Sequence, residues 1–177
     1  MIYYRTKQIV NYANRGMILE DDINLTNKYY LENDIALIYK KPTPIKITKV
    51  DYRQSKINEA YFEAPSTLDY NGLYKGKYIE FDAKETNSKT SFPLSNIHKH
   101  QYIHLKKVIE QGGIGFLIVR FNLLDLNYIL LGEDLIDFVN SNERKSIPLS
   151  YFEEVGYPLK MAFRPRLNYL NVIDKLL

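Results

Sequence analysis

Two aspartates and a lysine have residue types and spacing that predict metal-dependent cleavage of phosphodiesters. Asp69 and Asp82 flank a tyrosine-rich, alternating stretch that contains a turn signal at Lys75-Gly76. If that pair forms the loop of a β-hairpin, counting outward pairs Asp69 with Asp82, with their Cβ atoms roughly 4.5–5.5 Å apart. Like charges so close destabilise each other, and the arrangement therefore requires a cation. Alternation along the strand puts Lys84 on the same face as Asp82.

The helix expected next in the chain must supply further polar groups to this face. Its pattern opens at Pro93 and Ser95 and ends near Gly112-Gly113. One face, expected to be buried, consists of Ile97, Gln101, Leu105 and Val108. Gln101 is its only polar member, and a buried amide needs partners. It either binds a cation or a cation-bound water near the acids, or lies at the edge of the stripe with its amide in solvent.

Three histidines on the same helix raise the question of a transition-metal site. His100 and His104 are spaced i, i+4, which can hold such a metal. The glutamate of an HExxH motif is missing, however, and no third ligand is evident. We interpret His98, His100 and His104 as residues of the polar face that contact DNA.

The remaining patterns predict one α/β domain, residues 1–177, around a largely antiparallel or mixed sheet. The expected helical segments are 17–31, 133–139, 151–155 and an amphipathic tail at 168–177. The expected strands are a buried one at 35–39, a more exposed ribbon beginning near 45–50, and two more at 114–121 and 126–131. A loop is expected at 52–58.

Composition excludes several classes of site. The chain has 177 residues, 45% hydrophobic and 25% charged, as in water-soluble globular proteins. It has no cysteine, which excludes disulfides, thiolate metal sites and cysteine nucleophiles. No apolar run approaches a membrane span, and Arg5 and Lys7 interrupt any signal-peptide core. We expect a cytoplasmic protein.

Basic residues gather in one segment although the formal net charge is only +3. The segment from 40 to 56 contains a single acid, Asp51, and these basic residues: Lys40, Lys41, Lys46, Lys49, Arg53 and Lys56. A local imbalance of this kind can neutralise phosphates. The alternative is a solvated, charged loop.

Several motifs together resemble the RecU family of Holliday junction resolvases, within the PD-(D/E)xK nuclease superfamily. The motifs run from about residue 12 to the C-terminus: Asn14-Arg-Gly-Met17, Leu19-Glu-Asp-Asp22, Thr26-Asn-Lys-Tyr-Tyr30, Lys40-Lys-Pro-Thr-Pro44, Asp69-Tyr-Asn-Gly72, Ala83-Lys-Glu-Thr86, Thr90-Ser-Phe-Pro-Leu94 and Pro165-Arg166. The order of the motifs is that of the family.

The resemblance implies a homodimer with a restriction-endonuclease-like core, in which helices flank a mixed central sheet. It also implies a stalk that enters the four-way DNA junction, here the insertion at about 41–62, and paired nicks in opposite strands. Its metal-binding positions fall on Thr67, Asp69, Asp82 and Gln101, and its catalytic lysine on Lys84. The expected cofactor is Mg²⁺, with Mn²⁺ as a substitute. Arg15 and the basic residues of segment 40–56 would bind DNA, and a recombinase stays open as a protein partner.

One departure from the family pattern affects the second ligand. The family usually has glutamate at the position of Asp82 and aspartate at the position of Glu80, so the two acids are exchanged here. Both lie on one face of the strand, and the sequence leaves open which of them is the principal ligand, with Glu80 as an auxiliary candidate. Lys84 likewise either acts on the attacking water or the transition state, or only forms a salt bridge with the aspartates.

Three rival functions follow from the same residues. A restriction-like or repair endonuclease acting on linear duplex would not need the stalk. A non-catalytic junction-binding protein with a degenerate nuclease site would account for the exchanged acids. A structural protein that uses the acids for dimer salt bridges fits less well, because buried acids are a costly way to build an interface.

Overall fold

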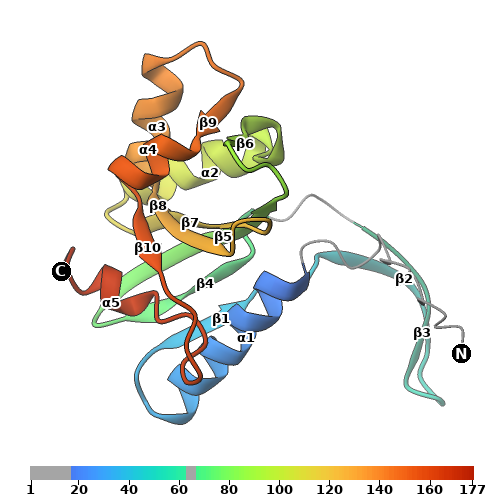
Figure 1. The fold of residues 1–177 in the computed structure, drawn as a ribbon. Coiled ribbons are helices and arrows are strands. Elements are labelled where there is room, and N and C mark those ends of the chain that lie inside the picture. Colours follow the sequence, from blue (N-terminus) through green and yellow to red (C-terminus); the bar gives the residue numbers. More distant parts are fainter. Residues whose placement is uncertain (1–16, 63–66) are drawn as a thin grey trace, which may run out of the picture.

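A six-stranded mixed sheet separates two layers of helices in the computed structural model, which describes residues 17–62 and 67–177 (Figure 1). The strand order is β1 (Leu37–Lys40), β4 (Tyr70–Tyr74), β5 (Lys77–Thr86), β7 (Ile114–Phe121), β8 (Leu126–Leu131) and β10 (Tyr157–Leu159). Only β5 and β7 pair in parallel, and the other neighbours are antiparallel. The predicted α/β class with a mixed central sheet is therefore confirmed.

One face of the sheet is covered by α1 (Met17–Glu32) and α5 (Leu170–Ile173). The stripe expected on the first helix is buried, with Leu19, Ile23 and Tyr30 at most 1% exposed. Under it, the ring of Phe81 on β5 stacks on the ring of Phe116 on β7 with centroids 4.7 Å apart. This aromatic core fixes the middle of β5, the strand that carries the candidate site.

The opposite face is covered by α2 (Lys99–Glu110), α3 (Gly132–Ser141) and α4 (Leu149–Glu154), as Figure 1 shows. A small sheet of β6 (Ser91–Pro93) and β9 (Ser146–Pro148) joins this layer, together with the short 3₁₀ helix η2 (Leu94–Asn96). Leu105 of α2 packs in the same buried cluster as Leu117 and Val119 of β7. The helix α2 connects the parallel strands β5 and β7, and it therefore runs back along them in the opposite direction.

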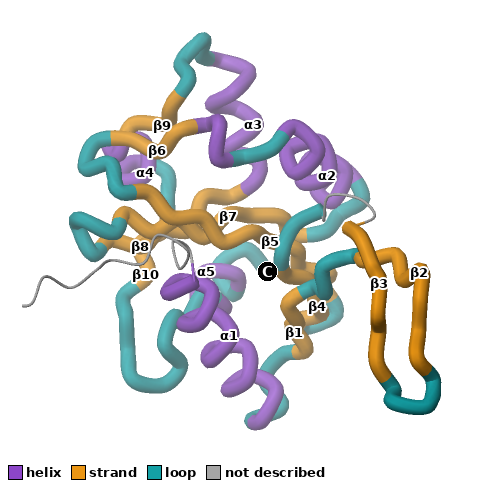
Figure 2. Tube along the Cα trace, turned by 90° about the vertical axis from the view of Figure 1, so that its right-hand side faces the viewer, coloured by secondary structure: helices purple, strands orange, loops and turns teal. Residues whose placement is uncertain are grey.

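An antiparallel ribbon of β2 (Ile45–Asp51) and β3 (Lys56–Phe62) stands apart from this body (Figures 1 and 2). All of β3 is exposed, and β2 has only Val50 and Asp51 half-buried. Two apolar rings, Tyr52 and Phe62, are 87% and 78% exposed. The ribbon contributes nothing to either core, so its sequence is not explained by packing within one chain.

Four expectations on the elements need correction. The strand expected at 35–39 as a buried one begins at Leu37 and lies at the sheet edge, where Leu37 and Tyr39 are exposed. The loop expected at 52–58 is shorter, because pairing with β2 extends β3 back to Lys56.

The helix expected from Pro93 starts only at Lys99, after η2, because the backbone of His98 is extended. The helical part of the tail is limited to α5. The helices at 17–31 and 133–139 and the strands at 114–121 and 126–131 are confirmed to within a few residues. In the described ranges, 17–62 and 67–177, no helix has the length and apolarity to cross a membrane.

Candidate active site

The hairpin of β4 and β5 has the register that the turn residues predict. Lys75 and Gly76 form its loop, with positive φ of 48° and 77°, which suits a two-residue hairpin turn. The pairs then run from Tyr74 with Lys77 to Tyr70 with Phe81. The pairing ends there, and Asp69, directly before Tyr70, has its side chain in contact with Asp82.

The neighbouring strand holds this hairpin in place through a close backbone approach. β1 pairs with β4 so closely at Gly72 that a Cβ atom there would lie 2.0 Å from the carbonyl oxygen of Leu37. The backbone N–H of Lys41, just after β1, donates to the carbonyl oxygen of Asp69 at 2.7 Å. The backbone of Asp69 is therefore held by the residue that directly follows the neighbouring strand β1.

Alternate residues of β5 face different helical layers. Phe81 and Ala83 point into the core under α1. Glu80, Asp82 and Lys84 therefore share the face covered by α2. Beside Asp82 and Lys84 in the parallel register lie Leu117 and Val119 of β7, which are fully buried. The site is thus a polar stripe at the edge of an otherwise apolar layer.

Asp82 is a buried acid whose charge the described residues compensate only in part. Its side chain is 0% exposed, and one oxygen lies 2.9 Å from Nζ of Lys84. Neither carboxylate oxygen has a hydrogen bond of good geometry in the described chain. Burial and, after it, the contact with Asp69 raise the pKa of Asp82 to about 8, although the charge of Lys84 opposes both effects. A divalent cation between the two aspartates would satisfy these oxygens.

The oxygen donors around Asp82 fit a hard cation. Within the described residues, no three or more histidine or acidic side chains are grouped to hold a metal. A metal here would thus rely on the two aspartates together with neutral oxygens, for which Thr67 and Gln101 are the candidates. Thr67 is half-buried, and Gln101 is 6% exposed. Carboxylate oxygens, the main-chain carbonyl of the Thr67 segment and an amide oxygen suit Mg²⁺ or Mn²⁺ rather than zinc.

Gln101 is buried in α2, which excludes the alternative of an amide in solvent. Its Oε1 accepts the backbone N–H of His98 at 3.1 Å and so closes the first turn of the helix. An amide oxygen has two lone pairs, and this bond leaves one acceptor position. Gln101 therefore combines a structural role at the helix start with one remaining acceptor.

The opposite directions of α2 and β5 place Gln101 at the level of Asp82. At one end, Nε2 of His104 lies 2.8 Å from Oε1 of Glu80. At the other end, His98 and Lys84 line the same hollow. Gln101 lies between the two histidines on the helix, and Asp82 lies between Glu80 and Lys84 on the strand.

Glu80, the auxiliary candidate, is satisfied by the protein itself. It is 1% exposed, and its carboxylate forms an ion pair with Lys41. It also contacts Nε2 of His104 at 2.8 Å and accepts the hydroxyl of Tyr78 at 2.7 Å. Burial alone would raise the pKa of Glu80, but the hydrogen bonds from Lys41, His104 and Tyr78 outweigh it and lower the pKa. Of these two acids, Asp82 is the one whose oxygens lack hydrogen-bond partners among the described residues.

These contacts give two residues surroundings that the sequence did not indicate. His104 is not simply a polar-face residue, since its ring is bonded to a buried acid and its side chain is 30% exposed. Lys41, which the charge pattern groups with the ribbon lysines, has a side chain only 20% exposed and is bonded to Glu80 and Thr67. Tyr78 was not anticipated, although its position two residues before Glu80 puts it on the same face.

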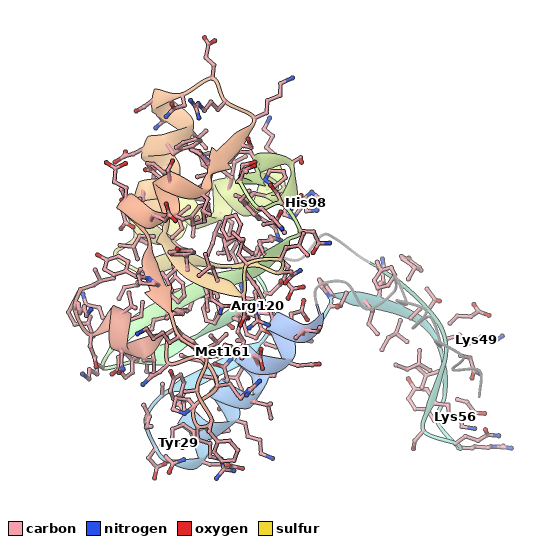
Figure 3. The ribbon with its side chains drawn as sticks, in the orientation of Figure 1. Tyr29, Lys49, Lys56, His98, Arg120 and Met161 are labelled. Atoms are coloured by element: carbon pink, nitrogen blue, oxygen red, sulfur yellow. The ribbon has the colours of Figure 1, made fainter. Side chains whose placement is uncertain are left out.

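Most of the other predicted DNA-binding residues lie on the ribbon of β2 and β3. Lys46, Lys49, Arg53 and Lys56 are exposed on the ribbon, and Figure 3 shows Lys49 and Lys56 far from His98 in the body. Lys49 lies 3.6 Å from Glu59 across the ribbon. Lys40 forms an ion pair with Glu20 of α1. Arg15 lies outside the described residues.

A polar hollow of about 550 Å³ opens beside Lys84. Its lining includes Lys84, Asn87, Ser95, Asn96, His98 and Asn122. Most of the lining side chains are neutral hydrogen-bonding groups, and the lining also contains the charged pair Lys84 and Glu85. The surroundings of Lys84 are therefore suited to a polar ligand that reaches the aspartates from this side.

Comparisons with known proteins agree with these features. The sequence model of the family RecU, described as recombination protein U, matches residues 14–175. A "Holliday junction resolvase RecU" of Geobacillus kaustophilus is 51% identical over 172 residues, covering 94% of this chain and 86% of that protein. The protein of the same name from Pediococcus pentosaceus is 52% identical, with the same coverage.

A solved structure described as Hjc, a Holliday junction resolvase from Archaeoglobus fulgidus, is a more distant match. It aligns with a TM-score of 0.47 and 9% identity over 81% of this chain and 95% of that one. This similarity is too low to add to the assignment.

Proposed function

The chain belongs to the RecU family, and we propose that it is a metal-dependent endonuclease that resolves Holliday junctions by paired nicks in opposite strands. The observation that carries this proposal is the buried Asp82, opposite Asp69 and 2.9 Å from Lys84, with carboxylate oxygens that lack hydrogen-bond partners in the described chain. Burying an acid in this way destabilises a fold, and such a cost is typical of functional sites. Relatives about half identical to this chain carry the name of junction resolvases.

Asp69 and Asp82 are the proposed carboxylate ligands of Mg²⁺, for which Mn²⁺ can substitute, with Thr67 and Gln101 as neutral oxygen donors. When bound, the ion supplies an activated water and neutralises charge that builds on the scissile phosphate. The exchange of acids at positions 80 and 82 fits this assignment. The shorter Asp82 keeps its oxygens free, whereas the longer Glu80 reaches Lys41, His104 and Tyr78.

Lys84 is the proposed catalytic lysine. Its ammonium is held 2.9 Å from Asp82, and its side chain is 16% exposed toward the polar hollow. From this position it can orient the attacking water or donate to a phosphate oxygen as negative charge develops there. The contact with Asp82 limits the motion of Lys84, so the donor is in place before the substrate arrives.

The ribbon of β2 and β3 is the proposed stalk. It stands off the body, and its exposed lysines and Arg53 can track DNA phosphates. Such contacts give affinity and orientation without reading sequence. Paired nicks in opposite strands require two sites, and we therefore propose that the functional unit is a homodimer.

Cleavage of a synthetic four-way junction tests this function against a linear duplex of the same sequence. Each labelled DNA is incubated with the protein in Mg²⁺, in Mn²⁺ and in EDTA. We expect cleavage of the junction in either metal, none in EDTA and little of the duplex. Equal cleavage of both DNAs would favour a duplex endonuclease, and tight junction binding without cleavage would favour a non-catalytic binding protein.

A further inference from the structure

Lys41 joins the chain segments on the two sides of the ribbon. It lies between β1 and β2, whereas Thr67 lies between β3 and β4. Nζ of Lys41 donates to Oγ1 of Thr67 at 2.7 Å, and its backbone N–H donates to the carbonyl oxygen of Asp69 at 2.7 Å. One residue therefore holds both ends of the short segment from Thr67 to Asp69. That segment supplies two of the proposed metal ligands.

Glu80 provides a rigid anchor for this lysine. Its carboxylate pairs with the ammonium of Lys41 and is itself held by Tyr78 of the same strand and His104 of α2. The side chain of Glu80 is 1% exposed, so these partners replace the water that a free carboxylate would bind. The Thr67–Asp69 segment is thus tied through Lys41 to the strand that carries Asp82.

The same contacts argue against a phosphate-binding role for Lys41. Its ammonium has three donors, of which Glu80 and Thr67 take two, and its side chain is only 20% exposed. To bind a phosphate fully, it would have to leave a buried carboxylate without its cation, which is strongly destabilising. Lys46, a few residues on, has an exposed side chain.

We propose that Lys41 is a positioning residue of the nuclease site. Anchored by Glu80, it closes the base of the ribbon and holds Thr67 and Asp69 in the arrangement that binds the metal. This inference rests on the proposed function, because it takes those residues as ligands. Lys41 begins the connection to β2, and Thr67 lies on the connection from β3, so the contact between them joins the two chain segments that link the ribbon to the body.

Mn²⁺ binding to the full chain without DNA tests the inference. The free-ion signal in electron paramagnetic resonance gives the Kd for the original protein and for Lys41→Met, Lys41→Met/Glu80→Gln and Lys46→Met. The double variant removes both charges and leaves an amide for Tyr78 and His104, so it guards against misfolding of the single variant. Circular dichroism establishes that each protein is folded at the temperature used. Junction affinity is measured in parallel in EDTA.

We expect both Lys41 variants to raise the Mn²⁺ Kd by about 10–100-fold, as for other residues that orient metal ligands. Their junction affinity in EDTA should stay unchanged, whereas Lys46→Met should weaken junction binding and leave the Mn²⁺ Kd as it was. Normal Mn²⁺ affinity in a folded Lys41 variant would overturn the inference. Weaker junction binding by Lys41→Met would indicate a phosphate contact instead. In that case the slope of log affinity against log salt concentration should also fall by about one. Absence of Mn²⁺ binding by the original protein would refute the proposed metal site itself.

Discussion

Asp82→Asn should stabilise the metal-free protein while it removes nuclease activity. The native carboxyl is 0% exposed and lies against Asp69, so its ionised form is unfavourable in the folded state. Asparagine has almost the same size and no charge, and its amide can donate to the carboxylate of Asp69. The substitution therefore removes an electrostatic cost without leaving a cavity.

The magnitude follows from the pKa of Asp82, which burial and the contact with Asp69 raise from 3.8 to about 8 against the charge of Lys84. At pH 7 the unfolded chain has lost this proton and the folded chain has kept it. Each pH unit between the unfolded pKa and pH 7 corresponds to about 1.4 kcal/mol. The native carboxyl therefore lowers the free energy of unfolding at pH 7 by at most about 4 kcal/mol. Water penetration and relaxation reduce this value, and we expect a gain of about 1–3 kcal/mol at pH 7.

The sign of the pH dependence makes the test specific. A folded-state pKa above the unfolded one gives a stabilising contribution that is complete below about pH 4 and lost as the pH rises through about 8. Urea unfolding in EDTA, at several pH values in this range, measures the free energy of unfolding of the original protein and of Asp82→Asn. The advantage of the variant should grow with pH, and the exposed Asp137→Asn should show no such trend. A variant that is less stable throughout, or an advantage independent of pH, would refute the reasoning.

Three further outcomes follow from the same site. Mg²⁺ should raise the melting temperature of the original protein and not that of Asp82→Asn, because an ion at about 100 times its Kd adds about 2.7 kcal/mol to the free energy of unfolding. Equal shifts of the two melting temperatures in calorimetry would mean that the ion binds elsewhere. Lys84→Met should keep junction and Mn²⁺ binding but lower kcat by about 10²–10³-fold, as loss of a charge-stabilising donor does; single-turnover cleavage near the original rate would reduce Lys84 to a structural salt bridge. Replacing residues 45–62 by a short glycine-serine linker should abolish the preference for junctions over duplex, and competition binding that still favours the junction would exclude the ribbon as the stalk.

The hairpin and the burial of Gln101 were predictable because they depend on local sequence. Lys75-Gly76 fixes the turn, and alternation then sets which residues oppose each other and which share a face. Gln101 follows from helical periodicity, since Leu105 and Val108 lie on the same stripe. Both inferences use spacings of a few residues, where backbone geometry leaves little freedom.

The roles of Lys41 and His104 were not predictable, because they depend on long-range packing. Glu80 is 39 residues from Lys41 and 24 from His104 in the sequence. Whether a lysine next to a basic ribbon points outward or back depends on where β1 joins the sheet. The apolar residues of β1 do not show whether it is an edge strand or a central one. In the structure β1 lies at the edge of the sheet beside β4, and this position brings Lys41 next to Asp69.

Mapping the nicks on a four-way junction tests the central claim most directly. Each of the four strands is labelled in turn, and the products formed in Mg²⁺ are sized for the original protein and for Asp69→Ala, with junction binding measured for both in EDTA. We predict two symmetrically placed nicks in opposite strands, both lost in Asp69→Ala although junction binding is retained. Nicks that persist in this variant, or that occur in one strand only, would contradict the account.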